Sequence, residues 1–231
     1  MRASLFIALL FAVTILCVQA AISQQSHDEK PTYLYDVLLS QDMSKDLFQL
    51  KQTILKTHPA PFFNCSDSLF NAAYEKAVRL VQKPKTVLEF AQVINGFTRI
   101  IEDSHTALNP RELLRLASKK RKIAPFHLKK IGENFYLSKI LYDAIPLGVE
   151  VLAVNDKTVK ELYLLTRTLA PSEGPAKSAR HELIEIMMGL VFNLFNKTPT
   201  QPVNITYVYG DDTLSSIAPS IKLSRYFGRN S

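Results

Sequence analysis

The sequence predicts an α+β chain, in which a helical first half precedes a half where strands and helices alternate. Between residues 42 and 122, apolar residues recur at the spacings of three and four that mark one face of a helix. After Ala124-Pro125, segments of alternating apolar residues appear, as in half-buried strands. The composition, 47% hydrophobic and 21% charged, is ordinary for a globular protein and excludes disorder, collagen and coiled coil as descriptions of the whole chain.

Residues 1–20 have the pattern of a secretory signal peptide. Met1-Arg2 gives a positive start, an apolar run continues to Leu16, and Val18-Gln19-Ala20 has the form of a cleavage site. We therefore expect cleavage near Ala20, a secreted or periplasmic location, and no stable membrane span afterwards. A retained signal anchor and a lipid on Cys17 are the alternatives, and the large Leu16 disfavours the lipid.

Cleavage would leave a basic chain with a single cysteine. The full chain has two cysteines, so losing Cys17 leaves Cys65 alone and excludes an internal disulfide. The formal net charge of the full chain is +7, and losing Arg2 lowers it by one, to +6. The densest basic run, residues 119–122, fits a solvated helix end, where cations suit the helix dipole. Because no aromatic residues interleave it, we expect no nucleic-acid partner.

Residues 21–41 lack a clear period, and we interpret them as a linker. The first helix is expected from residue 42 to His58-Pro59, because a residue before proline is pushed out of the α region. A second helix should begin around Ser66–Ser68, which are good N-caps, and end before Pro84.

The third helix has the clearest start in the sequence. Thr86 and Glu89 form a capping box, in which each side chain satisfies the other's backbone N–H. We expect this helix to end at Asp103-Ser104-His105. Asn109-Pro110 then predicts a further helix, so that residues 42–122 form a small helical bundle.

The second half is expected to alternate strands and helices. The turn formers Asn155-Asp156 end the second strand, and Gly210-Asp211-Asp212 separates the last two. The expected strands are 135–141, 148–156, 202–209 and 213–222, and the expected helices are 158–169 and 176–195.

Three motifs, in this order, resemble the carboxy-terminal processing (tail-specific) serine peptidases, especially their tricorn-like branch. The first is a helix that ends in a His-Pro pair, His58-Pro59. The second is the helix from Thr86 that leads to Asp103-Ser104-His105-Thr106, which is similar to the family's Asp-x-His-Thr motif. The third runs from Gly148 to Asn155-Asp156 and resembles a stretch of the family's PDZ-like domain. Together the resemblance covers roughly residues 42–218.

The resemblance implies a domain organisation. It implies a helical N-terminal domain at 42–123, a PDZ-like domain at 124–222 and a tail at 223–231. In the family the nucleophilic serine lies in a core domain that follows the PDZ-like domain. A core needs on the order of 100 residues, so we expect it to be absent here and the chain to be inactive alone.

The resemblance also names two candidate catalytic residues, Ser104 and His105. A Ser-His pair at this motif contributes the general base in the tricorn-like branch, whereas the other branch uses a Ser–Lys dyad. Without a nucleophile in this chain, His105 would be an orphaned base; the alternative is a structural histidine at a helix end.

No metal or cofactor is expected. His58 is interpreted as structural, and His127 is isolated. His181 and Glu185 are four residues apart on a helix, but a lone pair at this spacing is more often a solvated face than a metal site. Sequons for N-glycosylation begin at Asn64, Asn196 and Asn204.

The leading interpretation is an exported tail-specific-protease-like serine peptidase acting on peptides or proteins. The alternative is a non-catalytic secreted adaptor, in which the PDZ-like domain captures peptides by strand addition. A third possibility is a cell-envelope structural protein of unrelated function. The oligomeric state stays open.

Overall fold

The computed structural model describes residues 34–108, 113, 122–142, 145–171, 174, 177–195 and 202–222. Within them helices come first and a sheet follows, so the α+β class is confirmed. The chain divides into two compact units, residues 1–118 and 119–231. The expected signal peptide at 1–20 and tail at 223–231 lie outside the described residues.

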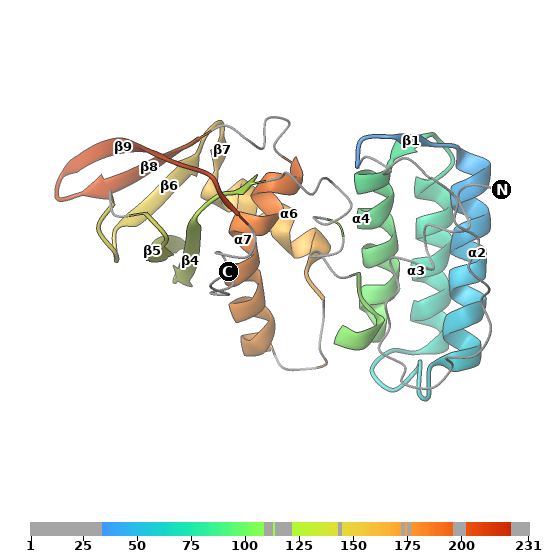
Figure 1. Cartoon of the computed structure of the whole chain (residues 1–231). Coiled ribbons are helices and arrows are strands. Elements are labelled where there is room, and N and C mark those ends of the chain that lie inside the picture. The colour runs from blue at the N-terminus through green and yellow to red at the C-terminus, as the bar shows by residue number, and fades with distance from the viewer. Residues whose placement is uncertain are drawn as a thin grey trace. The chain divides into compact units, whose positions relative to one another are not determined.

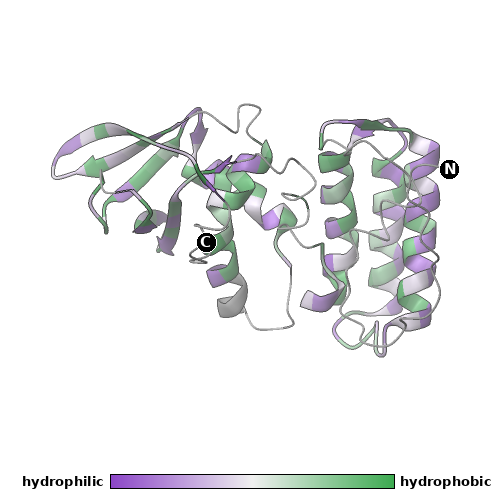
Figure 2. Ribbon diagram, viewed as in Figure 1, coloured by the Kyte–Doolittle hydropathy of each residue, from purple (hydrophilic) through white to green (hydrophobic). Residues whose placement is uncertain are grey.

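The described part of unit 1 contains the α-helices α2 (Ser40–Thr57), α3 (Asp67–Leu80) and α4 (Val87–Thr98). In Figure 1, α3 lies between the other two, and it packs against both. The buried face of α2 includes Leu47, Leu50 and Ile54, as the sequence period predicted, but Leu55, expected on the same face, is exposed. Helix α4 is buried over most of its circumference, as its mainly hydrophobic colour in Figure 2 indicates. Fully buried side chains at the centre of the unit include Met43, Leu47, Phe70, Ile94 and Phe97.

The helix boundaries follow from local chemistry. The Ser66 side chain accepts the Leu69 N–H at the start of α3, as expected for an N-cap. At the start of α4, the Thr86 hydroxyl accepts the Glu89 N–H at 3.2 Å, and the Glu89 carboxylate accepts the Thr86 N–H at 2.7 Å. The predicted capping box is therefore present.

The end of the expected linker is structured. Residues Val37–Leu38 form strand β1, which pairs antiparallel with β2 (Lys85–Thr86), and Leu34 is buried. Such a short strand carries no readable period, which is why the sequence interpretation missed it. The helix expected after Asn109-Pro110 lies almost entirely outside the described residues.

Unit 2 is built on a six-stranded antiparallel sheet with the order β4-β5-β6-β8-β9, in which β7 also pairs with β6. Its strands are β4 (Phe126–Ile131), β5 (Asn134–Ile140), β6 (Glu150–Val154), β7 (Lys157–Thr158), β8 (Val203–Tyr209) and β9 (Asp212–Ala218). Helices α6 (Val159–Leu169) and α7 (Lys177–Phe195) pack together; α6 contacts β6 and β7, and α7 contacts β4.

Two details of the sheet differ from the sequence expectations. Strand β4 was not expected, because only two buried apolar residues, Phe126 and Leu128, precede Lys129 and Lys130, and so short an alternation does not indicate a strand. The last strand was expected to reach residue 222 but ends at Ala218, before Pro219, which has no N–H to donate. Strand β10 (Ile221–Lys222) pairs instead with β3 (Lys122–Ile123) in a separate two-stranded sheet.

The structure confirms two turns that the sequence predicted. Asn155 has a left-handed φ of 53°, as expected for an asparagine in a turn. The β8–β9 hairpin turns through Gly210 and Asp211, and Gly210 has a φ of 62°, which glycine adopts without steric cost. Within the described part of the chain, no helix combines the length and the apolar content needed to cross a membrane.

Candidate functional site

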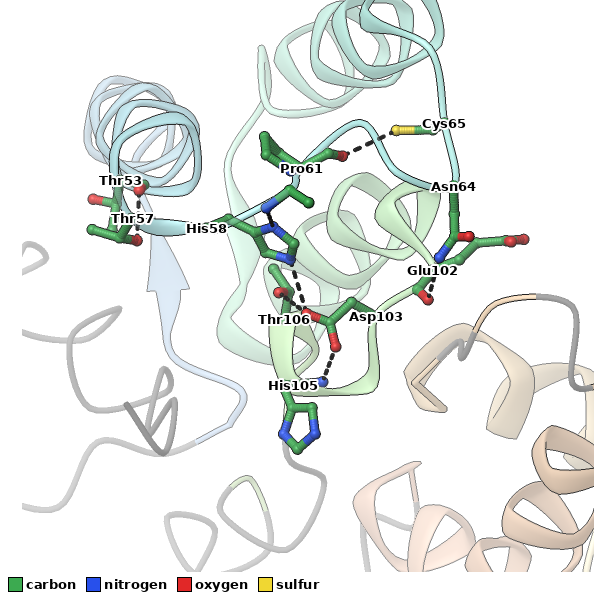
Figure 3. Close-up of polar contacts among 11 residues, drawn as sticks. Thr53, Thr57, His58, Pro61, Asn64, Cys65, Glu102, Asp103, His105 and Thr106 are labelled. Atoms are coloured by element: carbon green, nitrogen blue, oxygen red, sulfur yellow. Dashed lines mark hydrogen bonds and ion pairs between the residues drawn. The ribbon is translucent and has the colours of Figure 1, made fainter. Parts of the chain in front are cut away.

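The candidate site lies in unit 1, where the loop that follows α2 meets the loop that follows α4 (Figure 3). His58 is the first residue after α2; its extended ψ of 126° is the conformation that the following Pro59 imposes. Its Nδ1 accepts the N–H of Ala60 at 3.1 Å, and its Nε2 lies 2.9 Å from Asp103 Oδ2. Since Nδ1 is an acceptor, Nε2 carries the proton and donates it to the carboxylate.

Asp103 is the centre of the cluster. Its Oδ2 also accepts the Thr106 hydroxyl at 2.9 Å, and its Oδ1 accepts the His105 N–H at 2.9 Å. Burial raises the pKa of Asp103, but the hydrogen bonds from His105, His58 and Thr106 outweigh it and hold that pKa below its ordinary value. Asp103 is therefore a fixed carboxylate acceptor, and the turn Ser104–Thr106 (η2) is built around it.

The residue before Asp103 is conformationally unusual. Glu102 has a left-handed φ of 54°, which is uncommon outside glycine and asparagine. Its N–H donates to the carbonyl of Arg99, the first residue of the 3-10 turn η1 (Arg99–Ile101), and its own carbonyl accepts the Asn64 amide at 3.3 Å. Asn64 and His58 thus hold the same loop at two adjacent points, the carbonyl of Glu102 and the carboxylate of Asp103.

Cys65 lies beside this contact and is not a candidate nucleophile. It is buried, and its thiol lies 3.4 Å from the carbonyl of Pro61. Burial, together with the negative charge of Glu102, raises the pKa of the Cys65 thiol. A thiol held protonated in this way is a weak nucleophile.

The two residues named by the sequence resemblance lie on η2. Ser104 is half-buried, and His105 is exposed. The His105 imidazole points away from Asp103 in Figure 3 and has no hydrogen bond or ion pair with any described residue. The Asp103 carboxylate thus binds the backbone N–H of His105, and it binds the imidazole of His58 rather than that of His105.

The two histidines therefore differ in what they can do. Both ring nitrogens of His58 are engaged, so it is an anchor between two loops, which agrees with its structural interpretation. Among the described residues, the ring of His105 has no partner, and its backbone N–H is held by Asp103. The proposed catalytic role of Ser104 and His105 stays a prediction.

The other two histidines that the structure describes, His127 and His181, lie in unit 2 and do not form a cluster. Burial, with the charge of Lys139, lowers the pKa of His127 to about 4. His181 Nδ1 lies 2.9 Å from the Tyr163 hydroxyl, whereas Glu185 accepts the backbone N–H of Lys130 at 2.8 Å. His181 and Glu185 are thus directed to different partners.

Sequence reasoning missed the roles of Asp103 and Thr106. Their spacing of three residues is a local signal, since an Asp that starts a turn commonly accepts from the residues after it. The partnership of Asp103 with His58 spans 45 residues and has no signal in a single sequence.

Comparisons with known proteins identify a distant structural likeness. No protein-family model and no curated protein matches the sequence. Among solved structures, the chain is similar to mature CPAF, with a TM-score of 0.44 and 14% sequence identity. The similarity covers 78% of this chain and 34% of that chain, so the chain spans about a third of the length of CPAF.

Proposed function

We propose that this chain is the front part of an exported serine peptidase of the tail-specific type, in which His105 is the general base. One observation carries the proposal: the backbone of His105 is held by Asp103, while its imidazole is exposed and has no partner among the described residues. A general base needs an available nitrogen at a fixed position. The order of the three sequence motifs supports the choice of family.

The chemistry would follow the usual course of acyl transfer. Neutral His105 takes the proton from a serine hydroxyl as that oxygen attacks the carbonyl carbon of a peptide bond. It then donates the proton to the leaving amine as the carbon–nitrogen bond breaks. No described Ser, Thr or Cys side chain is bonded to the His105 ring, so we propose that the nucleophile lies outside the described residues. We propose that the nucleophile is carried by a core that assembles with this chain in the cell, so that the chain purified by itself is expected to lack peptidase activity.

The substrate would be a peptide or protein, and no cofactor is needed. A hydroxyl, a base and backbone donors suffice for this reaction. The signal-peptide pattern at residues 1–20 supports an exported location, secreted or periplasmic.

The test is active-site labelling of native assemblies. The chain is expressed with an affinity tag in its source cells, captured without denaturation, and treated with a fluorophosphonate probe that reacts with activated serines. We expect the wild-type capture to contain a labelled species. His105→Ala should abolish the labelling, and His181→Ala, which changes another exposed histidine, should leave it unchanged. Equal labelling of wild type and His105→Ala, or none in either, contradicts the proposal.

A second candidate is a non-catalytic peptide-binding module. The observation that favours it is that the outer strand β4 packs beside α7, the strand-and-helix arrangement that strand addition uses in PDZ domains. The carboxylate of Glu185 on α7 accepts a hydrogen bond from the backbone N–H of Lys130 on β4. A peptide that adds there must displace this carboxylate, so Glu185→Ala should retain more peptide from a C-terminal peptide library than wild type. Retention by neither protein excludes this binding mode.

A further inference from the structure

The two edge strands of the sheet of unit 2 differ in how well they are protected against pairing with another chain. Strand β4 forms one edge and β9 the other. Edge strands expose unpaired backbone groups, which invite pairing with another chain unless they are covered, charged or bent.

The β4 edge is protected in three ways. Its strand is irregular between His127 and Leu128, it carries Lys129 and Lys130, and the Lys130 N–H is taken by the Glu185 carboxylate of α7 at 2.8 Å. Each of these features opposes the addition of another strand.

The β9 edge has none of these protections. Strand β9 pairs with β8 over seven residues without a register shift, and after Asp212 at its start it contains no charged residue and no proline. No described strand pairs with its other side, and it is the outermost strand of the sheet in Figure 1. Ile217 is 68% exposed and Leu214 is 41% exposed.

The register identifies the unpaired backbone groups. The hairpin has a two-residue turn, so Tyr209 and Asp212 exchange hydrogen bonds, and the hydrogen-bonded pairs then alternate along the strands. It follows that Thr213, Ser215 and Ile217 direct their N–H and C=O groups away from β8. The backbone N–H and C=O groups of these three residues have no other partner among the described residues.

We propose that β9 is a dimerisation edge, which pairs antiparallel with β9 of a second copy of this chain. A two-fold axis at Ser215 sets this residue opposite its own copy and sets Thr213 opposite Ile217. All three outward-facing residues then exchange backbone hydrogen bonds with the copy.

This register is free of electrostatic conflict. Asp212, the charged residue of the strand, lies opposite Ala218 of the copy. The Thr–Ile pairs combine two β-branched side chains, which are favourable cross-strand neighbours, and each covers part of the exposed Ile217.

A second copy fits this edge better than an unrelated peptide. The strand of a copy is already extended, so pairing does not have to order a flexible chain. A peptide would also need side-chain pockets for selectivity, whereas the residues beside Ser215 on β8 are the polar Thr206 and the exposed Asn204.

Sedimentation velocity of the full chain over a concentration series tests the proposal, and wild type should shift from monomer to dimer as its concentration rises. Ser215→Lys and Ser215→Glu each place like charges face to face on the two-fold axis, so each variant should sediment as a monomer. An equimolar mixture of the two should recover the dimer, because opposite charges then face each other.

The matched control is Ser138→Lys, which adds the same charge at an exposed position on the interior strand β5 and should leave the dimer intact. Circular dichroism checks that each variant is folded, and Ser215→Pro, which removes one outward N–H, is a second disrupting variant. The proposal fails if wild type remains monomeric throughout the series. It also fails if the dimer persists in both charged variants and in Ser215→Pro, or if the mixture of charged variants stays monomeric.

Discussion

At the scale of single residues, one carboxylate organises the candidate site. Asp103 accepts hydrogen bonds from an imidazole, a hydroxyl and a backbone N–H, and these bonds hold two loops together. The side chains that stabilise this arrangement are those of His58, Asp103 and Thr106. His105 contributes only its backbone N–H, which any residue but proline supplies.

Substituting each of the two histidines by alanine distinguishes the one that anchors two loops, His58, from the one that is exposed, His105. His58→Ala should lower the free energy of unfolding by about 1–3 kcal/mol, because it removes a partner from a part-buried carboxylate. His105→Ala should change it by less than about 0.5 kcal/mol, as for other exposed side chains. Urea unfolding of both variants measures the difference. A large loss in His105→Ala would show that His105 is structural and would weaken its role as a base.

A second residue-scale prediction concerns Asp46, which lies on the buried face of α2. Burial, with the charge of Asp42 and against that of Lys45, raises the pKa of Asp46 to about 6. The folded chain therefore holds this proton more tightly than the unfolded chain does. Its contribution to stability is complete below about pH 4 and is lost as the pH rises through about 6.

Asp46→Asn should remove this pH dependence. We expect the variant to exceed wild type in unfolding free energy by about 1–3 kcal/mol at pH 8 and to match it near pH 4, since wild-type Asp46 is then protonated. Thermal unfolding at both pH values is the measurement. Glu75→Gln, which neutralises an exposed acid on α3, should show no such difference between the two pH values.

At the scale of elements, capping chemistry fixes where helices begin. Two helices start with the same device: Thr86 with Glu89 opens α4, and Thr158 with Glu161 opens α6. The first was predicted from the sequence. The second was overlooked, although its spacing is the same, because the apolar period already indicated a helix there.

Thr86→Ala should destabilise unit 1 by about 1 kcal/mol, because the Glu89 N–H loses its acceptor at the start of a buried helix. Thr57→Ala is the matched control: the hydroxyl of Thr57 is exposed and bonds the carbonyl of Thr53 within α2. Its removal should change the unfolding free energy by less than about 0.5 kcal/mol. Equal effects of the two substitutions would show that the capping hydroxyl of Thr86 contributes no more to stability than the exposed hydroxyl of Thr57.

At the scale of the whole molecule, the chain forms two units, and each has a hydrophobic core of its own. The core of unit 1 includes Phe70 and Phe97, and that of unit 2 includes Phe126 and Phe192. A unit with its own core can fold independently of its neighbour.

A fragment of residues 34–118 should therefore unfold cooperatively on heating, as followed by far-UV circular dichroism. The control fragment, residues 34–86, lacks α4 and with it the partner of the buried face of α3. It should show no cooperative transition. A non-cooperative 34–118 fragment would mean that unit 1 depends on the rest of the chain.

The sequence by itself determined the α+β class, the helix boundaries at Pro59, Ser66 and Thr86, and the alternating strand β8. These features depend on neighbours within a few residues: a proline ring, a capping hydroxyl, or a period of apolar side chains. The same locality explains why the turns at Asn155 and Gly210 were predictable.

Only the tertiary structure decided the candidate site and the sheet edges. The contact of His58 with Asp103 joins residues 45 positions apart, and the contact of Lys130 with Glu185 joins residues 55 apart. A local pattern holds no information about which distant groups meet, because that depends on how whole helices and strands pack. The sequence therefore named His105, and the fold showed that its ring has no partner among the described residues, whereas both ring nitrogens of His58 are engaged.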